Sequence, residues 1–168
     1  MVSFDKYGFN KELLESINGL GFKKPTPIQS KVIPEILSSD NDIIATAQTG
    51  TGKTAAFGLP LIYLTNNRKK TIEAVILCPT RELCLQISKD LNIYSEYMKY
   101  FRIIPIYGGS KVETQIKGLK QNPKIIVCTP GRLNDLIKRR RVDLSFVKYF
   151  ILDEADEMLS MGFKSEID

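Results

Sequence analysis

The stretch Ala47-Gln48-Thr49-Gly50-Thr51-Gly52-Lys53-Thr54 follows a short apolar run and opens a helical pattern that extends to about Leu64. Glycines let the backbone curl so that several N–H groups face one phosphate, and a helix N-terminus adds positive partial charge. In such a loop Lys53 reaches the β and γ phosphates of a nucleotide, and the Thr54 hydroxyl ligates Mg²⁺. The usual loop begins with Gly where Ala47 stands, but the glycine-rich turn is intact.

On either side of this loop, short runs rich in Ile and Val alternate with helical patterns. This alternation predicts an α/β fold with a mostly parallel sheet covered by helices on both faces. Ligands of such sheets gather at the carboxyl ends of the strands, where the Gly, Thr-Pro and acidic clusters fall. The predicted strands are Asp42–Ala47, Ala74–Cys78, Arg102–Tyr107, Lys124–Cys128 and Tyr149–Leu152. Helices are predicted to begin after Pro79-Thr80, near Lys111, after Thr129-Pro130 and after Asp153.

Two helices are predicted before the phosphate loop. The first is indicated by the helical spacing of Leu13, Leu14, Ile17 and Leu20. The second opens at Thr26-Pro27, which has the form of an N-cap followed by the first helical residue, and it extends toward Leu37. Pro34 falls inside this helix, so we expect a kink or an end near Ile33.

An acidic cluster, Asp153-Glu154-Ala155-Asp156, follows the last predicted strand. An Asp held rigidly at a strand end can bind Mg²⁺ and its water shell, and a neighbouring Glu can orient or deprotonate the attacking water. Acids also stabilise a helix N-terminus without further function, and the phosphate loop is what favours the hydrolytic interpretation. The candidate catalytic residues are Lys53, Asp153 and Glu154, and the candidate Mg²⁺ ligands are Thr54 and Asp153, partly through water.

The composition of the 168 residues is that of a soluble globular protein, with 43% hydrophobic and 26% charged residues. The net charge of +5 permits a polyanionic partner without proving one. The sequence has no His, which excludes a His-Cys zinc site and a Ser-His-Asp triad. Cys78, Cys84 and Cys128 have no paired spacing, which predicts reduced thiols and a cytoplasmic location. No apolar run approaches the roughly 18 residues of a membrane span.

Two basic clusters stand apart from these motifs, Arg68-Lys69-Lys70 and Lys138-Arg139-Arg140-Arg141. The first can be a solvated loop, and the second can place positive charge at a helix C-terminus, where the dipole favours it. Each is also a candidate contact for nucleic acid.

The loop and the acidic cluster spell AQTGTGKT and DEAD, and they resemble motifs I and II of the DEAD-box RNA helicase family. GFKKPTPIQ at residues 21–29 resembles the family's Q motif, and Phe4 lies where the family has an isolated upstream aromatic. PTREL at 79–83, Gly108-Gly109, and TPGR at 129–132 resemble motifs Ia, GG and Ib. The resemblance covers essentially the whole chain. It implies a Q-motif region at residues 1–40 and a partial RecA-like ATP-binding domain at residues 41–168.

The resemblance also implies a role for each residue of the nucleotide site. Gln29 would read the adenine edge with its amide and Phe22 would stack on the base, which predicts ATP over GTP. Core packing is the alternative for Phe22. The implied cofactors are ATP and Mg²⁺. The implied nucleotide-binding residues are Phe22, Lys24, Gln29, Ala47, Gln48, Thr49, Gly50, Thr51, Gly52, Lys53 and Thr54.

Motifs Ia, GG and Ib would line an RNA groove on the carboxyl edge of the sheet. Backbone N–H groups there would bind phosphates without reading bases, so binding would be sequence-independent and salt-sensitive. Arg132 could instead be a surface charge or part of an internal salt bridge. The implied RNA-binding residues are Pro79, Thr80, Arg81, Gly108, Gly109, Thr129, Pro130, Gly131 and Arg132.

Parts of the family's machinery do not occur in this sequence. It has no Ser-Ala-Thr motif and no second RecA-like domain with arginine fingers, and it ends at Asp168 inside the helix expected after DEAD. In RecA-like sheets the Ser-Ala-Thr strand lies between the strands that precede motifs I and II, so we expect an internal strand to be missing. Direct pairing would close the gap, or a strand would be borrowed through dimerisation or swapping. For the chain alone we expect weak nucleotide binding, negligible RNA-stimulated ATPase and no unwinding.

The leading hypothesis is therefore the ATP-binding domain of an ATP-dependent RNA helicase, with RNA and a second RecA-like domain as partners and no membrane association. A DNA helicase or translocase of the same superfamily is one alternative, which the Q motif and the spelling DEAD disfavour. A non-catalytic module that holds nucleotide or RNA is another, which the intact Lys53, Asp153 and Glu154 disfavour. A small-molecule kinase would leave Gln29 and the TPGR segment unexplained.

Overall fold

The computed structural model of the protein describes residues 3–164. The chain forms two compact units: the first holds the residues up to Asn67 together with Asp90–Tyr100, and the second holds Arg68–Lys89 together with the residues from Phe101 onward. In chain order the elements are η1 (Phe4–Tyr7), α1 (Lys11–Gly19), α2 (Pro27–Ser38), α3 (Lys53–Thr65), β1 (Ala74–Leu77), α4 (Arg81–Tyr94), β2 (Ile103–Ile106), α5 (Val112–Leu119), β3 (Ile125–Cys128), α6 (Pro130–Lys138), β4 (Tyr149–Leu152) and α7 (Ala155–Ser160).

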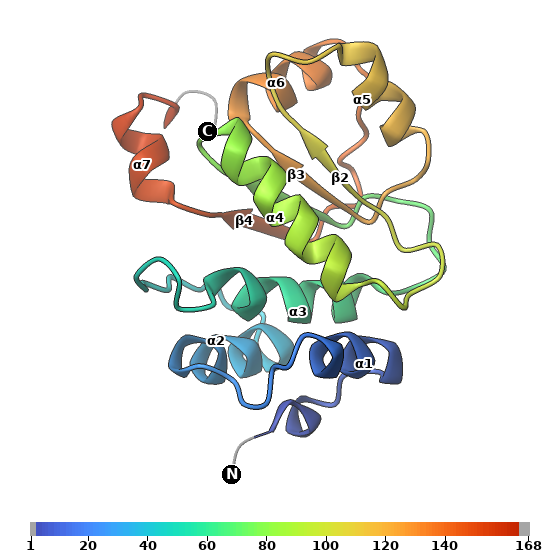
Figure 1. Ribbon diagram of the computed structural model, residues 1–168. Coiled ribbons are helices and arrows are strands. Elements are labelled where there is room, and N and C mark those ends of the chain that lie inside the picture. Colours follow the sequence, from blue (N-terminus) through green and yellow to red (C-terminus); the bar gives the residue numbers. More distant parts are fainter. Residues whose placement is uncertain (1–2, 165–168) are drawn as a thin grey trace. The chain divides into compact units, whose positions relative to one another are not determined.

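The second unit is built on a parallel sheet whose described strands have the order β2-β3-β1-β4 (Figure 1). Ala74 of β1 faces Ile125 of β3 on one side and Tyr149 of β4 on the other. All residues of β1 and β3 are buried, which explains why these strands are continuous apolar runs. The predicted parallel α/β fold is confirmed, and each of these four strands lies inside the range predicted for it.

Helices cover both faces of this sheet. On one face, Ile126 of β3 shares a core with Leu136 of α6 and Met158 of α7. On the other face, the Cys84 thiol of α4 donates to the Val127 carbonyl oxygen at 3.0 Å. The three cysteines of the chain are free and buried, as predicted.

The first unit is helical, and Figure 1 shows α1 and α2 running alongside α3. Thr26 is the N-cap of α2, as predicted. Of the two outcomes expected at Pro34, a kink or an end near Ile33, the end is not observed, because α2 continues through Pro34 to Ser38, close to the predicted extent toward Leu37. Pro34 removes only one backbone donor, and the complete burial of Ile33 shows that packing holds the helix beyond it.

The predicted strand Asp42–Ala47 is also wrong. Among the described residues this segment belongs to no strand, and the side chain of Ile44 is 96% exposed. A strand is stable only with a hydrogen-bonded neighbour, and no described strand pairs with this segment. The expected direct pairing that would close the sheet is therefore not observed, and β4 is an edge strand of the described sheet. Nothing within residues 3–164 supports the other expectation, a strand exchanged between two copies.

The helix predicted after the acidic cluster is present as α7, which ends at Ser160. Asp168, to which this helix was expected to extend, lies outside the described residues. In the part of the chain that the structure describes, no helix is both long enough and apolar enough to cross a membrane.

Candidate functional site: a phosphate loop and a cavity at the carboxyl edge of the sheet

The phosphate loop of the first unit has the backbone conformation that its glycines allow. Gly50 and Gly52 have φ values of 78° and 88°, in the left-handed region that side chains rarely adopt. The Thr51 hydroxyl donates to the Gln48 carbonyl oxygen at 2.7 Å and closes the turn. Gly52 is then the N-cap of α3, and Lys53 is the first residue of the helix.

The N-terminus of α3 has the donors that a phosphate requires. Among the described residues, no side chain caps this helix. The Ala56 N–H donates to the Gly52 carbonyl oxygen at 3.1 Å, and the N–H groups of residues 53–55 come before this bond. Lys53 and Thr54 are half-buried beside them. A helix start of this kind binds anions through its N–H groups and its dipole.

Gln29 contacts the phosphate loop directly. Its side chain is 4% exposed, Oε1 accepts from the Thr26 N–H at 2.9 Å, and Nε2 donates to the Gly52 carbonyl oxygen at 3.2 Å. A carboxamide has two oxygen lone pairs and two N–H donors, so each amide atom keeps one further hydrogen-bonding position. The spacing of Thr26 and Gln29 signals the capping box. No sequence signal indicates the bond to Gly52, and the adenine-reading role of Gln29 stays a prediction.

Phe22 and Lys24 are the other candidate nucleotide residues of the first unit. The half-buried ring of Phe22 stacks on Phe4 at a centroid distance of 6.4 Å and meets the edge of Tyr94 at 6.2 Å. Phe22 thus has the packing role that the sequence left open as its alternative, and base stacking remains a prediction. Lys24 is exposed.

The second unit has an open cavity of about 540 Å³ at the carboxyl edge of its sheet. Segments far apart in the sequence meet there because the carboxyl ends of parallel strands share one edge. Six of the nine candidate RNA residues line this cavity: Pro79, Arg81, Gly108, Thr129, Gly131 and Arg132. The other three, Thr80, Gly109 and Pro130, are their sequence neighbours and do not line it.

Three further residues, Asp135, Arg139 and Phe163, line this cavity. Arg139 belongs to the basic cluster that the sequence marked as a candidate nucleic-acid contact, whereas Asp135 and Phe163 were missed. Asp135 and Arg139 lie three and seven residues after Arg132, which puts all three on one helical face and was the available signal. The Arg139 Nε lies 2.7 Å from the Asp135 Oδ1 in an exposed ion pair. The cavity is therefore lined by three arginines and one acid.

The guanidinium of Arg132 holds the loop that carries Gly108 and Gly109. It donates to the Gln115 Oε1 at 3.1 Å and to the Ser110 carbonyl oxygen at 3.2 Å. Gln115 in turn donates from Nε2 to the Tyr107 carbonyl oxygen at 2.9 Å and to the Ser110 hydroxyl at 2.6 Å. Arg132 is thus an internal hydrogen-bonding residue. Gln115 is 7% exposed and was missed, although a Gln among the apolar residues of α5 was a visible signal.

Arg81 and Thr80 open α4 in two different ways. The Thr80 hydroxyl accepts from the Leu83 N–H at 3.2 Å and so caps the helix. The Arg81 guanidinium lies over the Tyr107 ring, 5.0 Å from its centroid. This contact fixes a cation above the loop after β2, and the guanidinium edge keeps donors for a phosphate.

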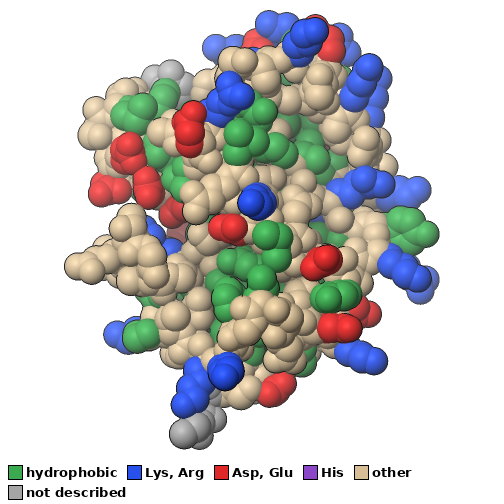
Figure 2. Space-filling model, viewed as in Figure 1, with side chains coloured by type: hydrophobic (Ala, Val, Ile, Leu, Met, Phe, Trp, Pro, Cys, Tyr) green, Lys and Arg blue, Asp and Glu red, His purple; other side chains and the backbone are tan. Residues whose placement is uncertain are grey.

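The acidic cluster lies at the carboxyl end of β4. The Asp153 N–H donates to the Leu77 carbonyl oxygen at 2.9 Å, which continues the pairing of β4 with β1. Glu154 has a φ of 54°, an uncommon conformation for a residue with a side chain, and is the N-cap of α7. A side-chain hydrogen bond with Glu154 is the main cause that raises the pKa of Glu157. Figure 2 shows acidic side chains gathered over α7.

Comparisons with known proteins agree with these motifs. The family model described as DEAD/DEAH box helicase matches residues 26–168. The ATP-dependent RNA helicase CshA of Listeria monocytogenes is 48% identical over 100% of this chain and 32% of its own length. The DEAD-box ATP-dependent RNA helicase CshA of Bacillus subtilis is 47% identical over 99% of this chain and 33% of its own length. The chain thus spans about a third of the length of these curated relatives.

Two solved structures have the same fold. A DEAD box protein from Methanococcus jannaschii is similar with a TM-score of 0.91 and 47% identity, over 99% of this chain and 45% of that chain. A hypothetical ATP-dependent RNA helicase from Sulfolobus tokodaii is similar with a TM-score of 0.86 and 36% identity, over 95% of this chain and 45% of that chain.

Proposed function

Since the chain belongs to the DEAD/DEAH box helicase family, we propose that it is the ATP-binding domain of an ATP-dependent RNA helicase. Such an enzyme couples hydrolysis of Mg-ATP to RNA binding and local unwinding of a duplex. The observation that carries the proposal is the start of α3, where Gly50 and Gly52 turn the chain and leave an uncapped helix N-terminus beside Lys53.

The residues of the chain fit a nucleoside triphosphate with Mg²⁺. The N–H groups at the start of α3 and the Lys53 ammonium suit phosphate oxygens, and the Thr54 hydroxyl and Asp153 carboxylate are the oxygen donors that Mg²⁺ takes. When bound, Mg-ATP would supply the phosphoryl group that water attacks. Lys53 would neutralise charge on the phosphates, and Glu154 would orient the attacking water and accept its proton.

The cavity at the carboxyl edge of the sheet, in the second unit, supports RNA binding. Arg81 and Arg139 lie at its wall with guanidinium donors, and Gly108 and Gly131 expose backbone there. Arg132 would act mainly by holding the Gly108 loop. These groups suit a sugar-phosphate backbone, so we expect sequence-independent and salt-sensitive binding.

A second RecA-like domain in the whole protein would complete the enzyme. It would supply arginine fingers, which are worth roughly 10³–10⁵ in rate in related phosphoryl-transfer systems. For the chain alone we propose weak nucleotide binding, negligible RNA-stimulated ATPase and no unwinding. Unwinding of a short RNA duplex by this chain would contradict that part of the proposal.

Titration of the chain with fluorescent ATP, ADP and GTP analogues tests the proposed function. We expect ATP and ADP to bind and GTP to bind more weakly, with that preference lost in Gln29→Ala. Lys53→Ala should weaken ATP binding by roughly ten- to a hundredfold, because it removes a charged donor to phosphate. Lys11→Ala, an exposed lysine on α1, is the matched control and should bind as the unaltered chain does. Equal affinities for ATP in the Lys53→Ala and Lys11→Ala variants would refute the proposal.

A further inference from the structure

A second cavity of the second unit, of about 370 Å³, lies at the opposite edge of the sheet from the proposed RNA cavity. Lys70 and Ile72 at its wall precede β1, Asn122 precedes β3, and Phe146 precedes β4. The amino ends of parallel strands meet at this edge, away from the motifs that follow the strands. The proposed helicase activity therefore does not use this cavity.

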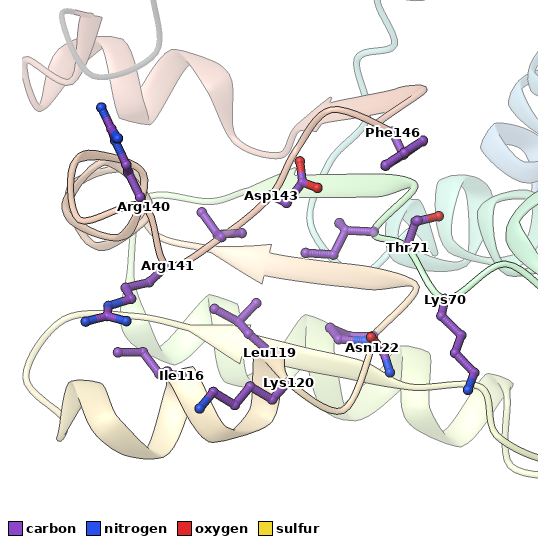
Figure 3. Close-up of a pocket in the computed structure, with 13 residues that line it drawn as sticks. Lys70, Thr71, Ile116, Leu119, Lys120, Asn122, Arg140, Arg141, Asp143 and Phe146 are labelled. Atoms are coloured by element: carbon purple, nitrogen blue, oxygen red, sulfur yellow. The ribbon is translucent and has the colours of Figure 1, made fainter.

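Both basic clusters of the sequence reach this cavity. Lys70 comes from the first cluster and Arg140 and Arg141 from the second, about seventy residues later, and Lys120 joins them from the end of α5. Figure 3 shows these four side chains around the cavity. The fold thus collects at one site charges that looked like separate solvated segments in the sequence.

These four cations carry no ion pair among the described residues, which distinguishes them from their neighbours. Arg139, next in sequence to Arg140, is paired with Asp135. Asp143 is the one acid of the described cavity wall, and its carboxylate already accepts from the Ser145 N–H at 2.9 Å. The cavity therefore has a surplus of exposed positive charge and fits an anionic partner.

The same cavity has an apolar floor. It is formed by Ile72, Ile116, Leu119, Val142 and Phe146. Four of them belong to the core or pack against it, whereas Phe146 is 54% exposed at the rim. Figure 3 shows Ile116 and Leu119 projecting from α5 among the charged residues of the wall. The backbone of a nucleic acid has no group that gains from such a floor, and bases stack on aromatic rings, of which the floor has one, Phe146. The four aliphatic residues of the floor suit an apolar side chain instead.

We propose that this cavity is a docking site for a short acidic segment of a partner protein, which inserts an apolar side chain between its carboxylates. The apolar side chain would lie on Leu119 and against Phe146, and the flanking carboxylates would pair with Arg140, Arg141, Lys70 and Lys120. The volume suffices for such an anchor, and the surrounding charges would set its orientation. The site is independent of the proposed ATP and RNA functions.

The test is fluorescence anisotropy of the chain with a labelled peptide of about ten residues, in which glutamates flank a central Leu-Phe pair. The variant Arg140→Glu/Arg141→Glu should weaken binding at least about tenfold, because it reverses two rim charges. Phe146→Ser should weaken binding at least about threefold, since it removes apolar contact. Its exposure means that the fold should survive this change. Circular dichroism and thermal unfolding verify the fold of each variant.

A matched control is Lys117→Glu/Lys138→Glu, which makes the same charge change at exposed lysines that do not line the cavity. This variant should keep the peptide affinity within about twofold, since neither lysine lines the cavity and exposed charges are screened by salt. A peptide with Ser-Ser in place of Leu-Phe should bind at least about threefold more weakly. Four outcomes would overturn the proposal: no binding, equal binding of the two peptides, equal losses in the two double variants, or displacement of the peptide by single-stranded RNA.

Discussion

Glu73 is a buried carboxylate that lies between two lysines at the amino ends of three neighbouring strands. Its Oε1 is 3.1 Å from the Lys124 Nζ and its Oε2 is 3.3 Å from the Lys148 Nζ. The side chains of Glu73 and Lys124 are 1% and 6% exposed, whereas that of Lys148 is 55% exposed. The Lys124 ammonium also donates to the Lys69 carbonyl oxygen. The buried acid therefore pairs with one buried lysine and one exposed lysine, and the two pairs should differ in energy.

We expect Lys124→Met to lower the free energy of unfolding by roughly 3–5 kcal/mol, because it leaves the buried Glu73 charge without its main partner. Lys148→Met should cost less, about 1 kcal/mol, since the Lys148 side chain is 55% exposed and Glu73 keeps its buried partner Lys124. Urea denaturation followed by circular dichroism measures both. Equal losses in the two variants would show that burial does not separate the two pairs.

Gly52 is constrained twice, by its backbone and by its neighbours. Its φ of 88° disfavours any side chain, and an added Cβ would collide with the Gln29 amide. Gly21 has a φ of 72° but open space around it.

Gly52→Ala and Gly21→Ala should therefore both cost roughly 1–2 kcal/mol in backbone strain. Gly52→Ala should cost more than Gly21→Ala, because the Gln29 side chain must also leave its hydrogen bonds. Chemical denaturation of the two variants compares them, and a smaller loss for Gly52→Ala would contradict the observed packing.

At the scale of the element, the sequence predicts those strands and helices that depend on the residues of the segment itself. The four strands from β1 to β4 were predicted because each is an apolar run followed by a turn and a helix, and burial explains the run in β1 and β3. Asp42–Ala47 has the same pattern, but a strand also needs a neighbour, which no local pattern reports. At Pro34 the local pattern left a kink or an end near Ile33 open, and α2 does not end there, since tertiary packing outweighs the missing donor.

Gln115 of α5 connects its helix to the loop after β2 and to α6. Its amide joins α5 to the loop of Tyr107 and Ser110 and to Arg132 of α6. We expect Gln115→Met to destabilise the fold by roughly 1–3 kcal/mol, because buried groups of the loop lose their partners. Amide hydrogen exchange in residues 108–111 should become faster.

The matched control for Gln115 is Gln86→Met, an exposed glutamine on α4. It should change neither the stability nor the exchange. Unchanged exchange of the loop in Gln115→Met would mean that the loop holds its conformation without α5.

At the scale of the whole molecule, each unit has a core of its own. Leu13, Ile33 and Leu59 are fully buried in the first unit, and the three cysteines are fully buried in the second. A hydrogen bond with Cys84, together with burial, raises the pKa of Cys78. Burial raises the pKa of Cys128 well above its usual range. Since the thiolate is the reactive form, both effects protect Cys78 and Cys128 in the folded state. The hydrogen bond with Cys78 lowers the pKa of Cys84, so that thiol is protected by its burial alone.

We therefore expect no thiol of the folded chain to react rapidly with an aromatic disulfide reagent, and all three to react after unfolding in guanidinium chloride. Raising the pH from about 7 to 9 should speed labelling of the unfolded chain, whose thiols have ordinary pKa values near 8.5, and leave the folded chain slow. Rapid labelling of even one thiol at neutral pH in the folded chain would contradict the observed burial.

Some features of the candidate sites could be predicted from the sequence and others could not. The glycines of the phosphate loop were predictable because they open a helix, and the acidic cluster was predictable because it follows a strand and precedes a helix. Three other features could not be predicted from the sequence. They are the hydrogen bond of Gln29 to Gly52, the support that Gln115 gives to the Gly108 loop, and the placement of Lys70 and Arg140 at one cavity. Each depends on where distant segments come together, which the order of residues does not display.

The hydrogen bond between Gln29 and Gly52 has a thermodynamic consequence. Under the proposed function Gln29 would read the base and the loop at Gly52 would hold the phosphates, and the structure joins the two by one hydrogen bond. A base that binds the Gln29 amide would weaken its hydrogen bond to Gly52 and so change the conformational freedom of the phosphate loop. A phosphate that orders the loop would in turn change how readily the Gln29 amide leaves Gly52 to bind a base. Linkage requires the two effects to be equal, so each half of a nucleotide would change the affinity for the other half by the same factor.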